Sequence, residues 1–410
     1  MLQSRIAWLD HDAEARERSI RVLAMFGERD TRDELGLGSI RDNLADLLFP
    51  GTSTIQTRLR YMFFVPWVYQ QVESELARGA LEADRVPARA SDLEFRIVDA
   101  LLDSDDQAGV FGVGSGRTLK RLPSSVYWAG LESWGIREVS LSQDRYVRSV
   151  AGLVGRRQAA QSLRLEVDGD AGGLGYRTWH AGLPEAPERF PAGISLSLTS
   201  EEAAFILDRV RECHPSSLLA HLFEGCLPAG VDYPWEHPDR SGFSDSQQEL
   251  LDHAEKLAVL AHGSFLLYNL ALSERRERED WVEHYEHRLD DWSASAQELP
   301  FAEWSLDELF GWTRAGSLRV SEGARTFLRE WLAKVLECGS DGGRLRADEG
   351  ARELIRLRES LLKKSRSRFN NPQALTQWSG KSGADRYNYR WATVSRFHRD
   401  LYAAFQRDGG

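Results

Sequence analysis

The residues with the clearest chemical spacing precede the most apolar run of the chain. The stretch GTSTIQTRLRYMFFVPWVY occupies residues 51–69, directly after a Pro-Gly pair that should end a helix at residues 40–49. Three residues with hydroxyl side chains follow, each of which could be the N-cap of a helix, although one helix needs only one N-cap. We predict that a new helix begins there, with its polar first turns at a cleft and its aromatic remainder in the core. The residues predicted to bind substrate are Thr52, Ser53, Thr54, Gln56, Arg58 and Tyr61.

Arg58 and Tyr61 illustrate how this predicted helix could carry chemistry. They are three residues apart, so they would share one helix face. The alternative is an ordinary core helix whose arginine is satisfied within the protein. That alternative requires no ligand.

A glycine-rich basic loop is the second candidate. Residues 109–116 contain four glycines and a serine, and basic residues follow, so backbone and side-chain donors could hold phosphate oxygens. The Gly-Lys-Ser or Gly-Lys-Thr sequence of a P-loop is missing, which excludes ATP hydrolysis of that type. The predicted phosphate contacts are Arg117, Lys120 and Arg121.

Aromatic residues follow this loop. Pro123-Ser124-Ser125 is predicted to start a helix that carries Tyr127 and Trp128. Flat side chains of this kind can stack on a base that has left the duplex. The alternative is that both are core aromatics at helical spacing.

The glycine turn Leu35-Gly36-Leu37-Gly38 is a third feature. A tight turn followed by an N-capped helix at residues 39–49 aims free backbone N–H groups at an anion, and the pattern loosely resembles a helix-hairpin-helix turn. The alternative is two helices joined by glycines.

Charge is distributed unevenly along the chain. The net charge is −11, yet residues 344–399 hold fourteen Lys or Arg against five Asp or Glu. The ending RYNYRWATVSRFHRD also interleaves cations with rings, among them Arg390 and Trp391. Such a segment could present a positive face to a nucleic acid. A solvated basic helix or a C-terminal docking helix is the alternative.

Signatures of metal sites and nucleophiles are missing from the sequence. His284 and His287 lack the HEXXH order, so we interpret them as part of a charged helix face. Asp103, Asp105 and Asp106 lack the spacing of a calcium loop, so we interpret them as a solvated turn. The three cysteines form no C-x-x-C pair, and no G-x-S-x-G elbow occurs. We therefore predict neither a metal nor a cofactor.

Helical periodicity dominates the elements that must position these residues. A short strand is predicted at residues 194–198, where apolar residues alternate, and Thr199 with Glu202 has the spacing of a capping box. We predict a mainly α fold with a few short strands and two to three packed subdomains. The predicted helices cover residues 13–26, 40–49, 93–102, 201–213, 247–270, 275–292, 324–337 and 352–362.

The length of 410 residues allows two to three domains. Turn-rich residues 168–191 and the Gly- and Asp-rich residues 338–350 suggest boundaries. We expect an N-terminal helical domain with the candidate cleft, a central helical domain with a short strand, and a basic C-terminal helical segment, at residues 1–165, 166–340 and 341–410.

The sequence carries no sign of secretion or membrane insertion. The N-terminus lacks an apolar region after a basic stretch, and the apolar run at residues 61–69 is about half the length of a membrane span. We expect a cytoplasmic protein that contacts no membrane.

Three strings carry a family resemblance that extends over nearly the whole chain. GTSTIQTRLRYMFFVPWVY, RLPSSVYWAGLESWGI and the terminal YRW resemble a bacterial family of unknown function that is often associated with phage-defence gene neighbourhoods. The chain is also similar to antiphage DNA glycosylases that remove glucosylated hydroxymethylcytosine. The resemblance implies excision of a modified cytosine from phage DNA, which leaves abasic sites, and partner proteins of a defence system.

The chemistry of such a glycosylase sets what the residues must do. The enzyme extrudes a nucleotide, holds the base, and stabilises an oxocarbenium-like sugar with a carboxylate that can activate water. If Lys120 attacked the sugar carbon, an imine-forming lyase would result, but a phosphate contact is the alternative. The candidate catalytic carboxylates are Asp10, Asp33, Glu34 and Asp42.

Two other function classes remain open. A non-catalytic DNA-binding or assembly subunit of a defence complex would use the same basic residues to hold phosphates, and its binding would be salt-sensitive without base excision. A nuclease is the third class, although the sequence shows no metal-ligand cluster.

Overall fold

The computed structural model describes most of the chain after its first 32 residues. The predicted helix at residues 13–26 and the candidate site residues Asp10 and Lys120 lie outside the described residues. The described residues are 33–114, 116–119, 121–166, 177–225, 230–314, 316 and 318–408.

The described residues form helices joined by turns and loops. They contain no β-strand, and an isolated bridge pairs Arg137 with Trp179. The prediction of a mainly α fold is therefore confirmed. The α-helices are α2 (Gly38–Leu48), α3 (Tyr61–Ala77), α4 (Val86–Leu102), α5 (Pro123–Ser133), α6 (Gln143–Glu166), α7 (Ser200–Cys213), α8 (Leu218–Glu224), α9 (Asp245–Arg275), α10 (Glu279–Gln297), α11 (Leu306–Arg314), α12 (Glu322–Glu337), α13 (Gly342–Ala347), α14 (Glu349–Lys363), α15 (Pro372–Thr376) and α16 (Trp391–Asp408).

The chain divides into two compact units, each made from two separate stretches of sequence. Unit 1 comprises Met1–Leu44 and Asp252–Tyr387, and unit 2 comprises Ala45–Leu251 and Asn388–Gly410. Unit 2 is thus completed by α16, which follows the long unit 1 stretch in the chain. The three-domain division at residues 165 and 340 stays a prediction.

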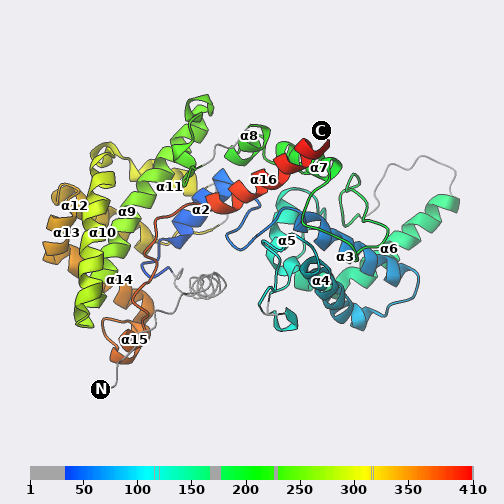
Figure 1. The fold of residues 1–410 in the computed structure, drawn as a ribbon, viewed down its shortest axis with the longest axis horizontal. Coiled ribbons are helices and arrows are strands. Elements are labelled where there is room, and N and C mark those ends of the chain that lie inside the picture. The colour runs from blue at the N-terminus through cyan, green and yellow to red at the C-terminus, as the bar shows by residue number, and fades with distance from the viewer. Residues whose placement is uncertain are drawn as a thin grey trace, which may run out of the picture. The chain divides into compact units, whose positions relative to one another are not determined.

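Unit 1 is organised around α9. The indole N–H groups of Trp292 and Trp331 donate to the carbonyl oxygens of Val259 and Leu260, each at 2.8 Å, which ties α10 and α12 to the same part of α9. α10 packs against α13, and α12 packs against α14 (Figure 1). Buried tryptophans that also find hydrogen-bond partners combine a large apolar area with directional contacts.

α9 is also long and apolar enough to cross a membrane. Its most apolar window has a mean hydropathy of 1.2, and 83% of that window is buried inside the protein. A helix that is apolar all round and covered by neighbours is typical of a core helix in a globular protein. A cytoplasmic location stays a prediction.

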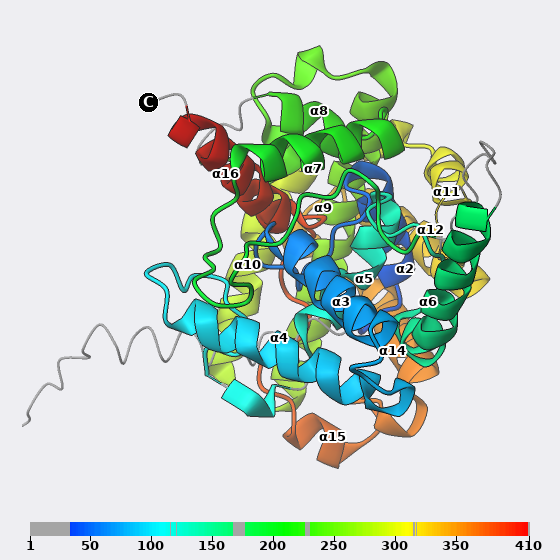
Figure 2. The ribbon, with the colours of Figure 1, turned by 90° about the vertical axis from the view of Figure 1, so that its right-hand side faces the viewer.

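Unit 2 is organised around α3, whose residues Tyr61 to Tyr69 are all buried. α3 packs against α4, α5 and α6, while α16 packs against α7 and α8 (Figure 2). The ring of Tyr69 lies 5.3 Å from the rings of Trp128 and Tyr146 and stacks on Trp179 at 6.3 Å. The apolar run of the sequence is therefore the central helix of this unit.

Two predicted helix starts are confirmed. Pro123 is the first residue of α5, where its missing N–H group costs nothing. α7 begins with the predicted capping box, because the Glu202 N–H donates to Thr199 Oγ1 at 3.1 Å and the Thr199 N–H donates to Glu202 Oε2 at 2.9 Å.

The predicted helix start at residues 52–54 is wrong, because α3 begins at Tyr61. Residues 51–60 form a loop, which we call the polar loop. Arg58 therefore lies outside the helix and shares no helix face with Tyr61.

Side-chain hydrogen bonds to nearby backbone keep the polar loop out of a helix. Thr52 Oγ1 donates to the Phe49 carbonyl at 2.6 Å. Gln56 bonds in both directions, since its Oε1 accepts from the Ser53 N–H at 2.9 Å and its Nε2 donates to the Gly51 carbonyl at 3.2 Å. Such local bonds compete with helical hydrogen bonding.

The glycine turn before α2 does not offer free N–H groups to an anion. The carboxylate of Asp33 accepts hydrogen bonds from the Leu37 N–H at 2.8 Å and the Gly38 N–H at 2.7 Å. The predicted anion site is therefore wrong, because a carboxylate of the same chain already occupies it.

The predicted strand at residues 194–198 is also wrong. This segment is extended between turns but pairs with no strand among the described residues. Arginine side chains bond to its backbone instead, since Arg60 Nη1 donates to the Ser195 carbonyl at 3.0 Å and Arg407 Nη2 donates to the Leu198 carbonyl at 3.2 Å. The alternating apolar residues face a helical core.

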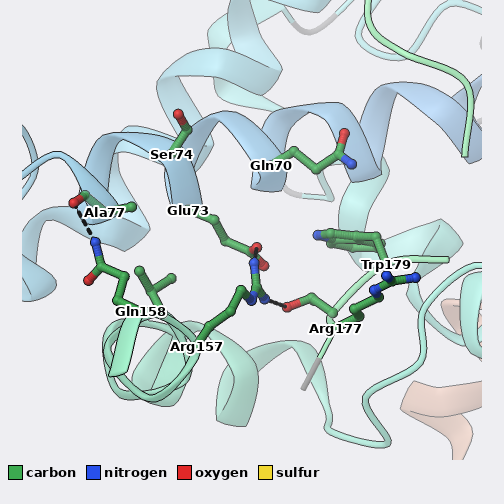
Figure 3. Close-up of a pocket in the computed structure, with 10 residues that line it drawn as sticks. Gln70, Glu73, Ser74, Ala77, Arg157, Gln158, Arg177 and Trp179 are labelled. Atoms are coloured by element: carbon green, nitrogen blue, oxygen red, sulfur yellow. Dashed lines mark hydrogen bonds and ion pairs between the residues drawn. The ribbon is translucent and has the colours of Figure 1, made fainter. Parts of the chain in front are cut away.

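A pocket of about 390 Å³ is bordered by α3, α6 and residues 177–179 (Figure 3). Its wall includes Trp179, the residue on which Tyr69 stacks. The central helix of unit 2 therefore supports both a core and an open pocket.

Close packing of α9 against α10 should make Gly263 intolerant of a side chain. A Cβ at Gly263 would lie 2.7 Å from ring atoms of Trp292, whereas a Cβ at Gly311, on an exposed part of α11, would meet nothing within 4 Å. We expect Gly263→Ala to lower the free energy of unfolding by about 1–3 kcal/mol and Gly311→Ala to raise it by about 0.5–1 kcal/mol. Urea denaturation checks both variants, and equal effects would contradict the packing.

Acidification should destabilise the protein through His262. Burial first, and the charge of Arg288 second, lower the pKa of His262 to about 4, whereas an unfolded histidine has a pKa of about 6.5. The unfolded chain then binds the proton more readily than the folded protein. The contribution of His262 to the free energy of unfolding is therefore complete above about pH 6.5, and it falls by about 1.4 kcal/mol for each pH unit between about pH 6.5 and pH 4.

Urea titrations across this pH range measure the effect. His262→Gln should flatten the decline in stability, and the variant His287→Gln, at an exposed position of α10, should not. Identical slopes for the two variants would contradict the assignment.

Candidate functional site around Arg58

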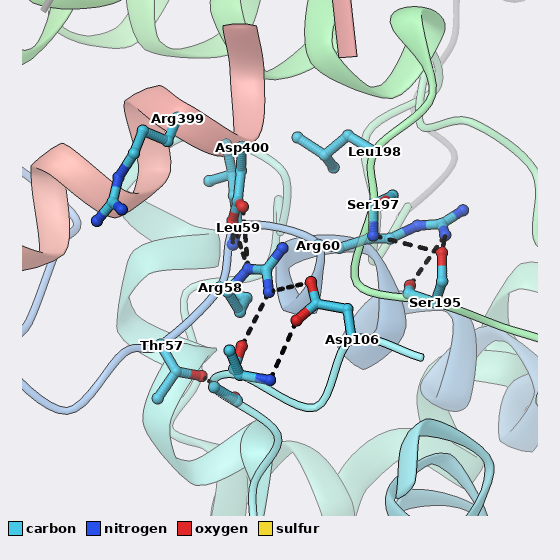
Figure 4. Close-up of polar contacts among 12 residues, drawn as sticks. Thr57, Arg58, Leu59, Arg60, Asp106, Ser195, Ser197, Leu198, Arg399 and Asp400 are labelled. Carbon is cyan, nitrogen blue, oxygen red and sulfur yellow. Dashed lines mark hydrogen bonds and ion pairs between the residues drawn. The ribbon is translucent and has the colours of Figure 1, made fainter. Parts of the chain in front are cut away.

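Arg58 connects three segments of unit 2. Its Nε donates to Asp400 Oδ1 on α16 at 2.9 Å, and its Nη1 donates to Asp106 Oδ2 at 2.7 Å and to the Ala108 carbonyl at 2.8 Å (Figure 4). The Leu59 N–H adds a bond of 2.9 Å to the second oxygen of Asp400. The polar loop, the loop after α4 and α16 therefore meet at one guanidinium group.

The two carboxylates bound by Arg58 have different environments. The side chain of Asp400 is 8% exposed, and that of Asp106 is 45% exposed. Burial raises the pKa of Asp400 despite the opposing charge of Arg58. For Asp106, burial is the largest single effect and would raise the pKa, but the hydrogen bond and charge of Arg58 together outweigh it and lower the pKa. Divergent pKa values in one cluster are typical of groups that divide acid and base roles.

Tyr127 fixes the backbone of the polar loop from beneath. Its hydroxyl accepts from the N–H groups of Thr57 at 2.9 Å and Arg58 at 3.1 Å, and it donates to the Arg58 carbonyl at 2.7 Å. The side chain is fully buried. A ring enclosed in this way offers no open face to an extruded base.

Trp128 is also a core residue. Its indole N–H donates to the Leu141 carbonyl at 2.8 Å, its ring packs against Tyr69 and Tyr146, and the Arg137 guanidinium lies 4.7 Å from the ring centre. Both predicted stacking residues therefore occupy the core, as the alternative interpretation expects.

Two further arginines bind the polar loop from α16 and the residue before it. Arg390 Nη1 donates to Asp46 Oδ1 at 2.7 Å and to the Thr52 carbonyl at 2.8 Å. Arg396 Nη2 donates to the Gln56 carbonyl at 3.1 Å. The structure thus brings the predicted site residues Thr52, Gln56, Arg58, Tyr127 and Arg390 together, although several of them bind each other rather than solvent.

The remaining predicted residues of this group lie at different places. Thr54 is exposed, Ser53 Oγ is buried without a hydrogen-bond partner among the described residues, and the Trp391 indole donates to the Val231 carbonyl at 2.8 Å. The Tyr61 hydroxyl accepts from the Phe111 N–H at 3.2 Å, which ties the glycine-rich loop to α3.

Exposed cations flank the cluster. Arg399 precedes Asp400 on α16 and is exposed, as is Arg121. Arg117 is exposed and pairs with Asp99 on α4 at 3.2 Å. Exposed cations of this kind are accessible to a phosphate backbone.

The predicted catalytic carboxylates belong to unit 1, whereas Arg58 and its partners belong to unit 2. The three that lie within the described residues each have a structural partner in unit 1: Asp33 caps the start of α2, Glu34 is buried and paired with Lys363 at 2.8 Å, and Asp42 pairs with Arg41 at 2.8 Å. Among the described residues, no group of three or more His, Cys, Asp or Glu could hold a metal ion.

The basic segment at residues 344–399 is divided between the units, and many of its cations are paired. Arg352 binds Glu274 at 2.6 Å and Arg346 binds Asp290 at 2.6 Å, both within unit 1. A surplus of positive charge in sequence is therefore largely neutralised by acidic neighbours in space.

Asp106 and Asp400 are the site residues that sequence reasoning missed. Asp106 sits in the acidic turn that we interpreted as solvated, and Asp400 is separated from Arg58 by 342 residues. The available signal was an acid that ends the basic RFHRD string, four residues after Arg396. Spacing alone could not show that this acid meets the polar loop.

Comparison with known proteins identifies a family whose function is unknown. Residues 3–405 match a family of unknown function, DUF6361. No curated protein and no solved structure matches the chain.

Removal of Arg58 should destabilise the protein strongly. Arg58→Ala leaves the buried Asp400 without its cation, which we expect to lower the free energy of unfolding by about 3–5 kcal/mol. Arg148→Ala is the control, because Arg148 forms an exposed pair with Asp144 one turn away on α6, and such pairs contribute about 0.5 kcal/mol or less. Urea denaturation of both variants is the measurement, and similar losses would refute a bracing role for Arg58.

Proposed function

We propose that this chain, which belongs to the DUF6361 family, is an antiphage DNA glycosylase that excises a modified cytosine base and leaves an abasic site. The resemblance of its sequence to defence-associated proteins supplies the substrate class, a glucosylated hydroxymethylcytosine in phage DNA. The geometry around Arg58 supplies a carboxylate suited to the reaction.

Asp106 is the observation on which the proposal depends. Its carboxylate is nearly half exposed, yet both oxygens are oriented, because Oδ2 accepts from Arg58 at 2.7 Å and Oδ1 accepts from the Ala108 N–H at 3.1 Å. Arg58 lowers the pKa of Asp106, which favours the ionised form. An oriented, ionised and accessible carboxylate meets the main requirement for stabilising a cationic sugar.

The reaction assigns Asp106 two roles. As the bond between the sugar C1′ and the base nitrogen breaks, the bonding electrons leave with the base, and the carboxylate stabilises the positive charge on the sugar. Water then adds to C1′ and transfers a proton to Asp106, and this proton is passed on through solvent to the departing base, which regenerates the carboxylate. The products are a free base and an abasic deoxyribose, so atoms and charges balance.

Asp400 is the positioning residue in this scheme. It is buried and binds the face of Arg58 opposite Asp106, so it balances the guanidinium charge and fixes its orientation. The exposed Arg399, Arg117 and Arg121 supply positive charge for the DNA backbone.

A non-catalytic DNA-binding subunit of a defence complex is the second candidate. One observation favours it: Arg58, Asp106 and Asp400 satisfy one another, so the cluster can serve as a brace without any substrate. In that case the exposed arginines bind DNA in a salt-sensitive manner, and excision requires another protein.

Asp106→Asn tests the catalytic assignment. We expect the variant to lose base excision by about a hundredfold or more, because the neutral amide cannot stabilise the sugar cation or accept the proton. The measurement is strand cleavage by alkali after incubation with DNA that contains glucosylated hydroxymethylcytosine. DNA binding should persist.

Asp105→Asn is the matched control, because it removes the same charge from the adjacent exposed residue. It should retain excision. Full activity of Asp106→Asn would reject Asp106 as the catalytic carboxylate. Tight DNA binding by the wild-type protein with no alkali-labile sites, even at stoichiometric protein, would reject the glycosylase and favour the binding subunit.

A further inference from the structure

One side of α14 is covered by the rest of unit 1, and an adjoining apolar strip of the same helix is largely exposed. α12 and α13 pack against the helix. Leu354, Leu357 and Leu361 are spaced by three and four residues, so they form one strip next to the covered side. We call this strip the leucine face. The buried residues of the helix are Ala351, Ile355, Arg358 and Glu359.

The leucine face is accessible to solvent along most of its length. Leu357 is 47% exposed, Leu361 is 72% exposed, and Leu354 is half-buried. The value for Leu361 is the highest among the exposed large apolar side chains of the described residues. Single exposed leucines are common on protein surfaces, but a continuous apolar strip is typical of a surface that contacts another protein. Spacing by three and four residues is also the pattern of a seam between two helices, so a helix fits this strip as its partner.

The charges at the two ends of the leucine face have opposite signs. Glu349 and Glu353 are exposed in the first half of α14, and Lys364 and Arg366 are exposed directly after its last residue. Lys364 and Arg366 form no ion pair within the part of the chain that the structure describes. Glu353 pairs with Arg356 on the same helix, but an exposed pair of this kind contributes little to stability, so Glu353 remains available to a partner.

We propose that the leucine face binds the leucine face of a second copy of this chain, with the two α14 helices antiparallel. In that orientation Leu357 of each copy packs between leucines of the other, and Glu353 lies near Lys364 of the second copy. A parallel pair would set acids against acids and bases against bases, so charge selects the antiparallel arrangement. Both copies use the same strip, which closes the interface at a dimer. The proposal does not depend on the function proposed for the Arg58 cluster.

The small size of the leucine face limits the strength of this pairing. A strip along one helix of 15 residues covers less area than the roughly 800 Å² that each partner buries in a standard stable complex. We therefore expect a reversible dimer whose population increases with protein concentration, and not an obligate dimer.

Sedimentation velocity of the full-length protein, over an about thousandfold range of concentration up to about 1 mM, measures the pairing. The average mass should rise from that of a monomer towards that of a dimer. A protein that stays monomeric at every concentration would overturn the proposal and assign the leucine face to a different occupant, either another segment of this chain or another protein.

Two leucine variants locate the interface. Leu361→Glu should weaken dimerisation by at least about tenfold, because it places a charge in the apolar seam. Leu318→Glu is the matched control, because Leu318 is a leucine of unit 1 outside α14 and is 42% exposed. It should leave dimerisation unchanged. Urea denaturation of the dilute proteins checks that both variants fold as the wild type does, and equal losses of dimer in the two folded variants would refute the interface.

Exchange of two charges tests the antiparallel orientation. Glu353→Lys alone should weaken dimerisation by about fivefold or more at low salt, because two ion pairs in each dimer become repulsive, and Lys364→Glu alone should have the same effect. An equimolar mixture of the two variants should dimerise as the wild type does, because each mixed dimer regains both pairs of opposite charge. A mixture that dimerises no better than either variant by itself would contradict the antiparallel pairing.

Discussion

The interaction of Arg58 with Asp400 is the constraint on which the organisation of unit 2 depends. A guanidinium that is 14% exposed must have its charge balanced, and the acid that balances it comes from the last helix described. The same guanidinium orients Asp106, and the backbone on both sides of it is fixed by Tyr127. One ion pair therefore determines the path of the polar loop, the position of α16 and the accessibility of a second carboxylate.

Local patterns predicted the elements better than they predicted the site. Helical periodicity, Pro123 and the Thr199 capping box depend on neighbouring residues, so the sequence carried enough information for them. Residues 194–198 were mispredicted because their backbone groups bond to arginine side chains from elsewhere in unit 2. The polar loop was mispredicted because local bonds of Thr52 and Gln56, together with a tertiary bond from Arg396, replace helical hydrogen bonds. Such tertiary bonds leave no periodic signal.

The site residues illustrate the same limit. Arg58 was identified because its type and spacing were unusual, but its function depends on two acids that are 48 and 342 residues away. The sequence suggests that Asp33 and Glu34 are free carboxylates. In the structure Asp33 accepts a backbone hydrogen bond and Glu34 forms an ion pair, both within unit 1. Burial decides whether a charged residue serves structure or chemistry, and burial is a property of the whole fold.

The division of the units along the chain has a consequence for biosynthesis. Unit 2 begins at Ala45, but α16 follows the entire stretch Asp252–Tyr387 of unit 1. During translation the helices from α3 to α8 leave the ribosome long before Asp400 is synthesised. Arg58 therefore lacks its ion-pair partner while the second stretch of unit 1 is made. Until then the polar loop has no buried anion to order it, and the incomplete unit presents the face of α7 and α8 that α16 later covers. This interval is the period in which the nascent chain most needs protection by a chaperone.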